Sequence, residues 1–119
     1  PRVVKLLFRV RAAEQLKQKV GGDLLVEGWV EGPCAQAADL RGINQLMVDF
    51  LDDEVFVRDL FEFVLEMEVG FARAQVEAGA DLIGIGDAAA SLISRATYEQ
   101  VVLPYEIRLV DAIHEMGAR

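Results

Sequence analysis

The sequence predicts an α/β fold: a partial (β/α)8 TIM barrel with about two βα units and a preceding helix. Helical periodicity alternates along the chain with two short apolar runs of strand type, and glycines stand at several of the changes. Strands that alternate with helices pair in parallel through right-handed crossovers. Two such strands are too few for a stable sheet. We therefore expect the 119 residues to be an incomplete, central segment of a barrel domain.

The first predicted elements are a helix and a strand. Apolar residues recur at intervals of three and four over residues 3–20, which predicts a helix that Gly21 and Gly22 end. The apolar run 23–26 is typical of a short strand. Two glycines and a proline within 27–33 then predict a loop.

The middle of the chain is predicted to be helical. Short helices are expected over 34–40 and 43–50, and Asp52-Asp53 supply an N-cap and negative charge for a long helix over 54–78. One apolar stripe of that long helix is expected to face the core, and its members are Phe56, Leu60, Phe63, Val64, Met67, Phe71 and Ala74.

The last part of the chain repeats the order of strand, loop and helices. The run 82–85 predicts a second strand, and the small residues of 86–94 predict a loop after it. A short helix is expected over 95–102. Pro104 fits the first turn of a further helix over 105–116, where its missing N–H is not needed.

Composition excludes several classes of protein. A net charge of −8 argues against a nucleic-acid partner, whose phosphates require clustered cations. No apolar run approaches the roughly 20 residues of a membrane span. Cys34 is the single cysteine, so no internal disulfide exists, and a reducing cytoplasm is the expected compartment. The start at Pro1 and the end at Arg119, directly after a predicted helix, suggest an excised segment.

The candidate site residues follow the two predicted strands, because reactive groups of a barrel lie at the carboxyl ends of its strands. Asp87 is the candidate catalytic residue; the alternative is that it caps the turn that follows it. Glu31, Trp29 and Ser91 are the candidate substrate-binding residues. For Glu31 the alternative is a solvated loop carboxylate, and for Trp29 it is an aromatic side chain packed over the rim.

No metal site is expected within the segment. Cys34 follows Gly-Pro near a predicted helix start, where a thiolate would be stabilised, but a small buried cysteine is the alternative. His114 lies inside the last predicted helix with no second histidine or cysteine at ligand spacing.

Three runs of sequence carry a resemblance to a known family. They are Gly32-Pro33 through Gly42, Gln75 through Asp87, and Tyr98 through Tyr105. In their order and motifs they resemble the uroporphyrinogen decarboxylase family, whose superfamily includes zinc-dependent methyltransferases that carry a methyl group from a corrinoid to a thiol such as coenzyme M. The resemblance implies a (β/α)8 barrel and matches Asp87 to a strand-end aspartate of the decarboxylases.

The same resemblance separates two branches of the family. Ala88 stands where decarboxylases carry a serine, and Asp39 falls about where they carry a tyrosine. These departures favour the methyltransferase branch, in which zinc would be held by a His-x-Cys pair and a later cysteine beyond Arg119. Zinc is therefore expected only in the parent protein.

Three functions remain open on this basis. The first is methyl transfer from a corrinoid to a thiol. The second is decarboxylation of uroporphyrinogen III in tetrapyrrole (heme) biosynthesis. The third is a non-catalytic association domain. The expected partners are a small molecule, a tetrapyrrole or a corrinoid in the parent enzyme. The segment alone is expected to be inactive and to associate with itself.

Overall fold

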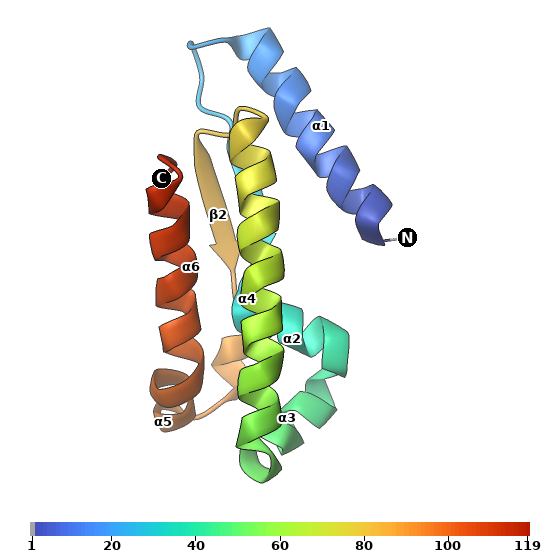
Figure 1. Cartoon of the computed structure of the whole chain (residues 1–119), viewed down its shortest axis with the longest axis vertical. Helices are drawn as coiled ribbons and strands as arrows, with labels where there is room; N and C mark the ends of the chain where they lie inside the picture. The colour runs from blue at the N-terminus through green and yellow to red at the C-terminus, as the bar shows by residue number, and fades with distance from the viewer. Residues whose placement is uncertain (1) are drawn as a thin grey trace.

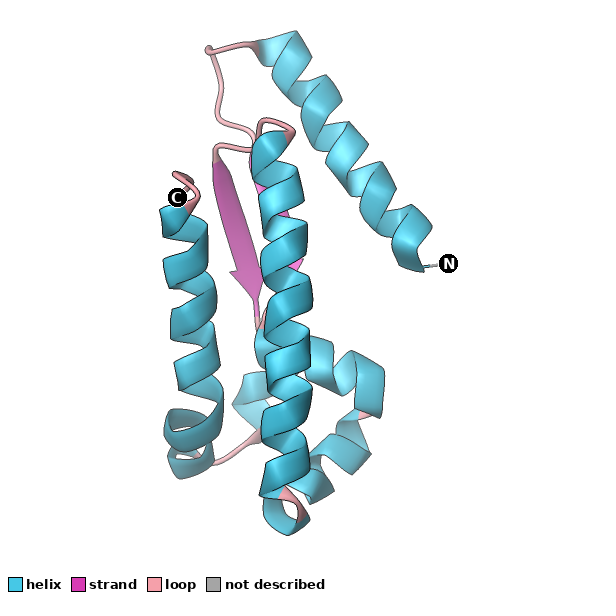
Figure 2. Cartoon of the chain, viewed as in Figure 1, coloured by secondary structure: helices cyan, strands magenta, loops and turns pink. Residues whose placement is uncertain are grey.

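The computed structural model describes residues 2–119, and within them helices flank a two-stranded parallel sheet (Figures 1 and 2). Glu27 pairs with Leu82 and Glu31 with Gly86. The long helices α4 and α6 run side by side along the strands. In chain order the elements are α1 (Arg2–Val20), β1 (Glu27–Glu31), α2 (Pro33–Arg41), α3 (Ile43–Asp52), α4 (Glu54–Glu77), β2 (Leu82–Gly86), a 3-10 turn (Ala88–Leu92), α5 (Arg95–Thr97), a π-helical turn (Tyr98–Val102) and α6 (Leu103–Glu115).

The first strand lies later in the chain than the sequence predicts. The apolar run 23–26 is not a strand: Leu24 and Leu25 are 64% and 67% exposed and belong to the connection after α1. In β1 itself every second residue, Gly28 and Val30, is buried. A glycine and two glutamates among five residues hid this alternation from the hydrophobic pattern.

The loop predicted over 27–33 is therefore wrong as well. Most of it is β1, and Pro33 already occupies the first turn of α2. Gly32 is the residue between the two elements. Its N–H donates to the Gly86 carbonyl at 2.7 Å, which extends the ladder between the strands by one step.

The long helix was predicted almost to the residue, and its buried face was predicted in part: Val64 is buried, and Leu60 and Phe71 pack against the core. The fully buried or nearly buried positions of α4 are Val57, Phe61, Val64, Leu65, Glu68, Ala72 and Gln75. Phe63, expected in the core, is 58% exposed. Gln75 is buried because its amide serves the backbone of β1: it accepts from the Trp29 N–H at 2.9 Å and donates to the Trp29 carbonyl at 3.1 Å. A polar residue thus occupies a core position that an apolar stripe cannot reveal.

The core lies between α4, α6 and the helix-facing side of the sheet. Phe61 is its largest fully buried side chain and packs against Tyr105, with 5.4 Å between ring centroids. Phe50 of α3 meets Phe61 edge-on at 6.0 Å. The last predicted helices form one continuous helical stretch, in which Pro104 lies in the first turn of α6 as expected.

Backbone pairing continues on the outer edge of β2. The Arg119 N–H donates to the Asp81 carbonyl at 3.2 Å, and the Ile83 N–H donates to the Arg119 carbonyl at 2.8 Å. These two bonds have the pattern of a parallel bridge. The chain therefore returns after α6 to the edge of β2 that β1 does not use. Within residues 2–119 there is no helix of the length and apolar character needed to cross a bilayer.

Candidate functional site

A pocket of about 500 Å3 opens at the carboxyl end of β2, where barrel enzymes carry their reactive groups. Asp87 directly follows the strand and reaches this pocket. The remaining lining residues come from the turn after β2 and from the helical stretch that follows, and they are Ala90, Ser91, Ile93, Arg95, Tyr98 and Glu106. Asp87 is therefore located where the sequence predicts it.

Asp87 is anchored by one of its two carboxylate oxygens. Oδ1 accepts from the Ala35 N–H at 2.6 Å, so the side chain caps the start of α2 from a neighbouring element. It accepts no bond from the turn that follows it, so the alternative of a cap on that turn is wrong. Oδ2 is buried and has no hydrogen-bond partner among the described residues.

Gly32 leaves the room that Asp87 occupies. A Cβ on this buried glycine would lie 2.3 Å from both Cβ and Cγ of Asp87. Real carbon atoms do not approach so closely, and neither backbone can move freely because the Gly32 N–H is bonded to the strand end.

We expect Gly32→Ala to displace Asp87 from the start of α2. Overpacking of this kind costs about 1–3 kcal/mol, which a lowered denaturation midpoint of the full-length protein would show. Gly70→Ala is the matched control, because no atom lies within 4 Å of its added Cβ on the exposed side of α4. The control should gain up to about 1 kcal/mol from helix propensity. Equal midpoints for the two variants would contradict this account.

The surroundings of Asp87 disfavour its charge. Burial raises the pKa of Asp87 to about 7, with the Glu106 carboxyl as the second cause. The N–H groups of Ala35 and Cys34 lower the same pKa but do not offset these two causes. A carboxyl group in this state can give up or take a proton near neutral pH.

Glu106 and Tyr98 belong to this site although the sequence pattern did not single them out. The Tyr98 hydroxyl donates a short hydrogen bond to Glu106 Oε1. This bond raises the pKa of Tyr98 to about 12, so the hydroxyl keeps its proton. Both residues lie in a helical stretch whose spacing suggests only packing, and no local signal points from them to Asp87.

Cys34 does not act as a thiolate here. Its side chain is fully buried at the start of α2. Burial, together with the charges of Asp87 and Glu106, raises the pKa of Cys34 to about 12. The alternative of a small buried cysteine therefore describes it better than a reactive thiol does.

The other candidate residues lie at different distances from Asp87. Ser91 lines the same pocket and donates to the Ala88 carbonyl at 2.8 Å. Trp29 is 44% exposed and lies over Gly84 and Gly86 of β2: a Cβ on Gly84 would lie 2.4 Å from the indole ring.

Glu31 lines a separate cavity of about 140 Å3, whose wall includes Lys5 and Arg9 of α1. Asp87 and Ser91 are therefore brought together, whereas neither Trp29 nor Glu31 lines their pocket.

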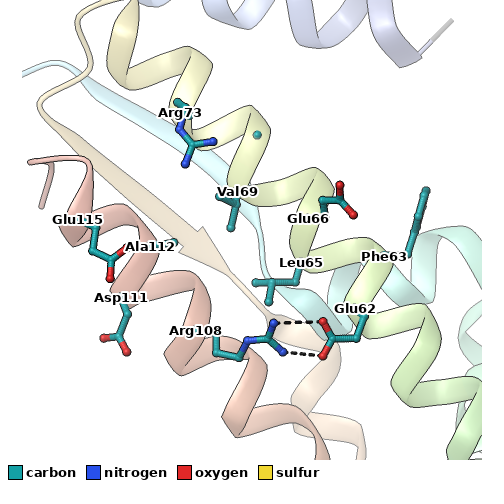
Figure 3. Close-up of a pocket in the computed structure, with 11 residues that line it drawn as sticks. Glu62, Phe63, Leu65, Glu66, Val69, Arg73, Arg108, Asp111, Ala112 and Glu115 are labelled. Carbon is teal, nitrogen blue, oxygen red and sulfur yellow. Dashed lines mark hydrogen bonds and ion pairs between the residues drawn. The ribbon is translucent and has the colours of Figure 1, made fainter.

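A wider groove of about 900 Å3 lies between α4 and α6 (Figure 3). The Arg108 guanidinium spans the groove and donates hydrogen bonds of 2.6 and 3.1 Å to the Glu62 carboxylate. None of the candidate residues lines this groove, and its walls are helix surfaces. The ion pair is half-exposed, which limits its contribution to stability.

The described part of the chain, residues 2–119, contains no cluster of three or more His, Cys, Asp or Glu side chains that could hold a metal ion. The potential donors at the site, the Asp87 and Glu106 carboxyls and the buried Cys34 thiol, do not form such a cluster.

Comparison with known proteins decides the family. The family described as Uroporphyrinogen decarboxylase (URO-D) matches residues 2–119. The chain belongs to the uroporphyrinogen decarboxylase family.

Relatives within the uroporphyrinogen decarboxylase family have two kinds of name. The chain is 35% identical over 109 residues to "Methylcobamide:CoM methyltransferase MtbA" of Methanosarcina mazei, with 90% of the chain and 32% of the relative covered. It is also 35% identical over 112 residues to "Uroporphyrinogen decarboxylase" of Geobacter sp. (strain M21), with 92% and 32% covered. The chain thus spans about a third of the length of these relatives.

A solved structure gives the same result for the fold. The chain superposes on a methyltransferase from Methanosarcina mazei with a TM-score of 0.84 and 27% sequence identity, covering 87% of this chain and 32% of the other. The paired strands and their covering helices are therefore those of a known α/β protein of this family.

Proposed function

We propose that this chain is the central segment of a (β/α)8-barrel enzyme that transfers a methyl group from a corrinoid to a thiol. The likeness to a solved methyltransferase supports the barrel, as do the parallel pairing of β1 with β2 and the bridge of Arg119 to the outer edge of β2. The segment spans about a third of its relatives, and by itself we expect it to be inactive.

The observation that carries this proposal is the position of Asp87, which follows the end of β2, lines the pocket and keeps one buried carboxylate oxygen without a hydrogen-bond partner among the described residues. When a thiol attacks a methyl carbon, the S–H bond loses its proton, an S–C bond forms, and the C–Co bond breaks with its electron pair left on the corrinoid. A carboxylate whose pKa is raised to about 7 can accept that proton at neutral pH. We therefore assign Asp87 as the catalytic proton acceptor.

The decarboxylase reading asks something different of Asp87. There a carboxylate would orient pyrrole N–H groups and stabilise a protonated ring. The resemblance places a serine of the decarboxylases at position 88, where this chain has Ala88 and supplies no hydroxyl. This departure favours methyl transfer.

We propose substrate-binding roles for the remaining candidates. Ser91 lies at the mouth of the Asp87 pocket and can hydrogen-bond a small acceptor molecule. Trp29 presents a half-exposed indole on the side of β1 opposite Val30, where a flat corrinoid or tetrapyrrole can stack. Glu31 follows it at the strand end. Zinc, implied by the resemblance, would need ligands other than those described.

The alternative is decarboxylation of uroporphyrinogen III, which the 35% identity to the Geobacter decarboxylase favours. One experiment separates the two. The full-length protein is incubated either with methylcobalamin and coenzyme M or with uroporphyrinogen III. We expect loss of methylcobalamin absorbance and formation of a methyl thioether. Decarboxylated porphyrinogen without methyl transfer would overturn the proposal, and the absence of both activities would leave a non-catalytic association domain.

A further inference from the structure

We propose that Glu106 is a positioning residue for Asp87: held by the Tyr98 hydroxyl, it faces Asp87 so that the two carboxyl groups keep one proton between them. The inference deepens the proposed function and rests on it, because a shared proton matters only where Asp87 exchanges protons with a substrate. Both Glu106 and Tyr98 are partly buried.

The geometry of Asp87 leaves one carboxylate oxygen, Oδ2, available to share a proton with Glu106. Oδ1 is committed to the Ala35 N–H at 2.6 Å, and Gly32 lies against the carboxyl carbon. Oδ2 is buried without a hydrogen-bond partner among the described residues. A buried acceptor without a donor is costly, and a proton shared with Glu106 satisfies it.

The helix is built so that Tyr98 can hold Glu106. The two residues are eight positions apart in the chain, and in a regular α-helix such a pair is about 80° apart around the axis. The π-helical turn Tyr98–Val102 takes up one extra residue, which reduces the separation to about 20°. The hydroxyl consequently reaches the Glu106 carboxylate. Turns of this kind occur often at functional sites.

The groups around Asp87 and Glu106 do not neutralise the negative charge of this carboxyl pair in the way that a bound proton does. Cys34 of α2 and the Tyr98 hydroxyl both remain protonated, since the pKa of each is raised to about 12. Among the described residues that line the pocket the one cation is Arg95, which is exposed and bonded to Glu99 at 2.7 Å. Two like charges at the pocket are therefore avoided by protonation.

The raised pKa of Asp87 makes the stability of the fold depend on pH in a definite direction. Because the folded pKa of Asp87 is raised from 3.8 to about 7, the folded state binds more protons than the unfolded state between these values. Stability contributed by this group is present below about pH 4 and is lost as the pH rises to about 7. A carboxyl group kept only for stability would have a lowered pKa in the folded state, so its contribution to stability would increase with pH.

The test follows the carbonyl-stretch infrared band of protonated carboxyl groups in the full-length protein as the pH is raised. We expect a band that disappears near pH 7 and is absent in Asp87→Asn, which assigns it. Glu106→Gln should lower the midpoint by about one pH unit or more, a tenfold change in proton affinity. Glu99→Gln, in the same helical stretch but facing Arg95, is the matched control and should leave the midpoint unchanged.

The outcomes separate this inference from the proposed function. An unchanged midpoint in Glu106→Gln, or a wild-type protein with no such band above pH 5.5, overturns the shared proton even if methyl transfer is observed. The expected band shift without methyl transfer to a thiol keeps the carboxyl pair and overturns the proposed function. In an active enzyme, the acidic limb of the pH profile of kcat/KM should move with the band.

Discussion

Replacement of Asp87 by asparagine is expected to lower turnover of the full-length enzyme at least tenfold, and toward the 10²–10⁴-fold range typical of a lost general base. Asparagine keeps the shape of the side chain and an oxygen that can accept from the Ala35 N–H, which Asp87 now binds at 2.6 Å. It caps a helix about as well as aspartate does. What it loses is the ability to exchange a proton near neutral pH.

The stability of the Asp87→Asn variant separates a catalytic role of Asp87 from a helix-capping role. Because the pKa of Asp87 is raised, its ionised form destabilises the fold at neutral pH. Asp87→Asn should therefore leave the denaturation midpoint at pH 8 unchanged or slightly higher while turnover falls. Asp53→Asn is the matched control, since the Asp53 side chain caps α4 through the Phe56 N–H at 3.1 Å on an exposed surface. Unchanged turnover in Asp87→Asn would reduce Asp87 to a helix cap.

How far the sequence could predict the fold depended on the kind of signal. A 24-residue helix such as α4 repeats its apolar period many times, and its bounds were predicted to within a residue. The five-residue β1 offers only two buried positions, and one of them is Gly28. The exposed Leu24 and Leu25 look more strand-like than the strand itself. Short elements with polar open faces therefore escape a hydrophobic pattern.

The site was predictable only as far as it follows strand order. Asp87 could be placed because the end of a predicted strand can be located in the sequence, and the reactive groups of barrels lie at the carboxyl ends of their strands. Glu106 lies 19 positions later, and its approach to Asp87 depends on how α6 packs. The bond from Asp87 to the start of α2 joins residues 52 positions apart. Neither contact can be predicted from the spacing of residues along the chain.

Exposed apolar surface is the remaining feature that needs an explanation. The chain has a radius of gyration of 15.3 Å, whereas a compact domain of this length has about 13.5 Å. Large apolar side chains are exposed on several elements, among them Phe8 at 69%, Val55 at 73% and Leu51 at 85%. Full burial of each would stabilise by about 1.5–3 kcal/mol. Several together rival the roughly 5–15 kcal/mol margin of a folded domain.

We therefore expect the 119-residue chain, prepared by itself, not to remain a compact monomer of 13.1 kDa. At micromolar concentration, sedimentation velocity should show association that increases with concentration, because copies can cover the apolar faces that the segment leaves open. Phe8→Ser on the outer side of α1 should weaken association, whereas Gln15→Ser, also exposed on α1, should not. A sharp monomer boundary with cooperative unfolding would mean that Phe61 and its neighbours form a sufficient core. The segment would then be an independent domain rather than part of a barrel.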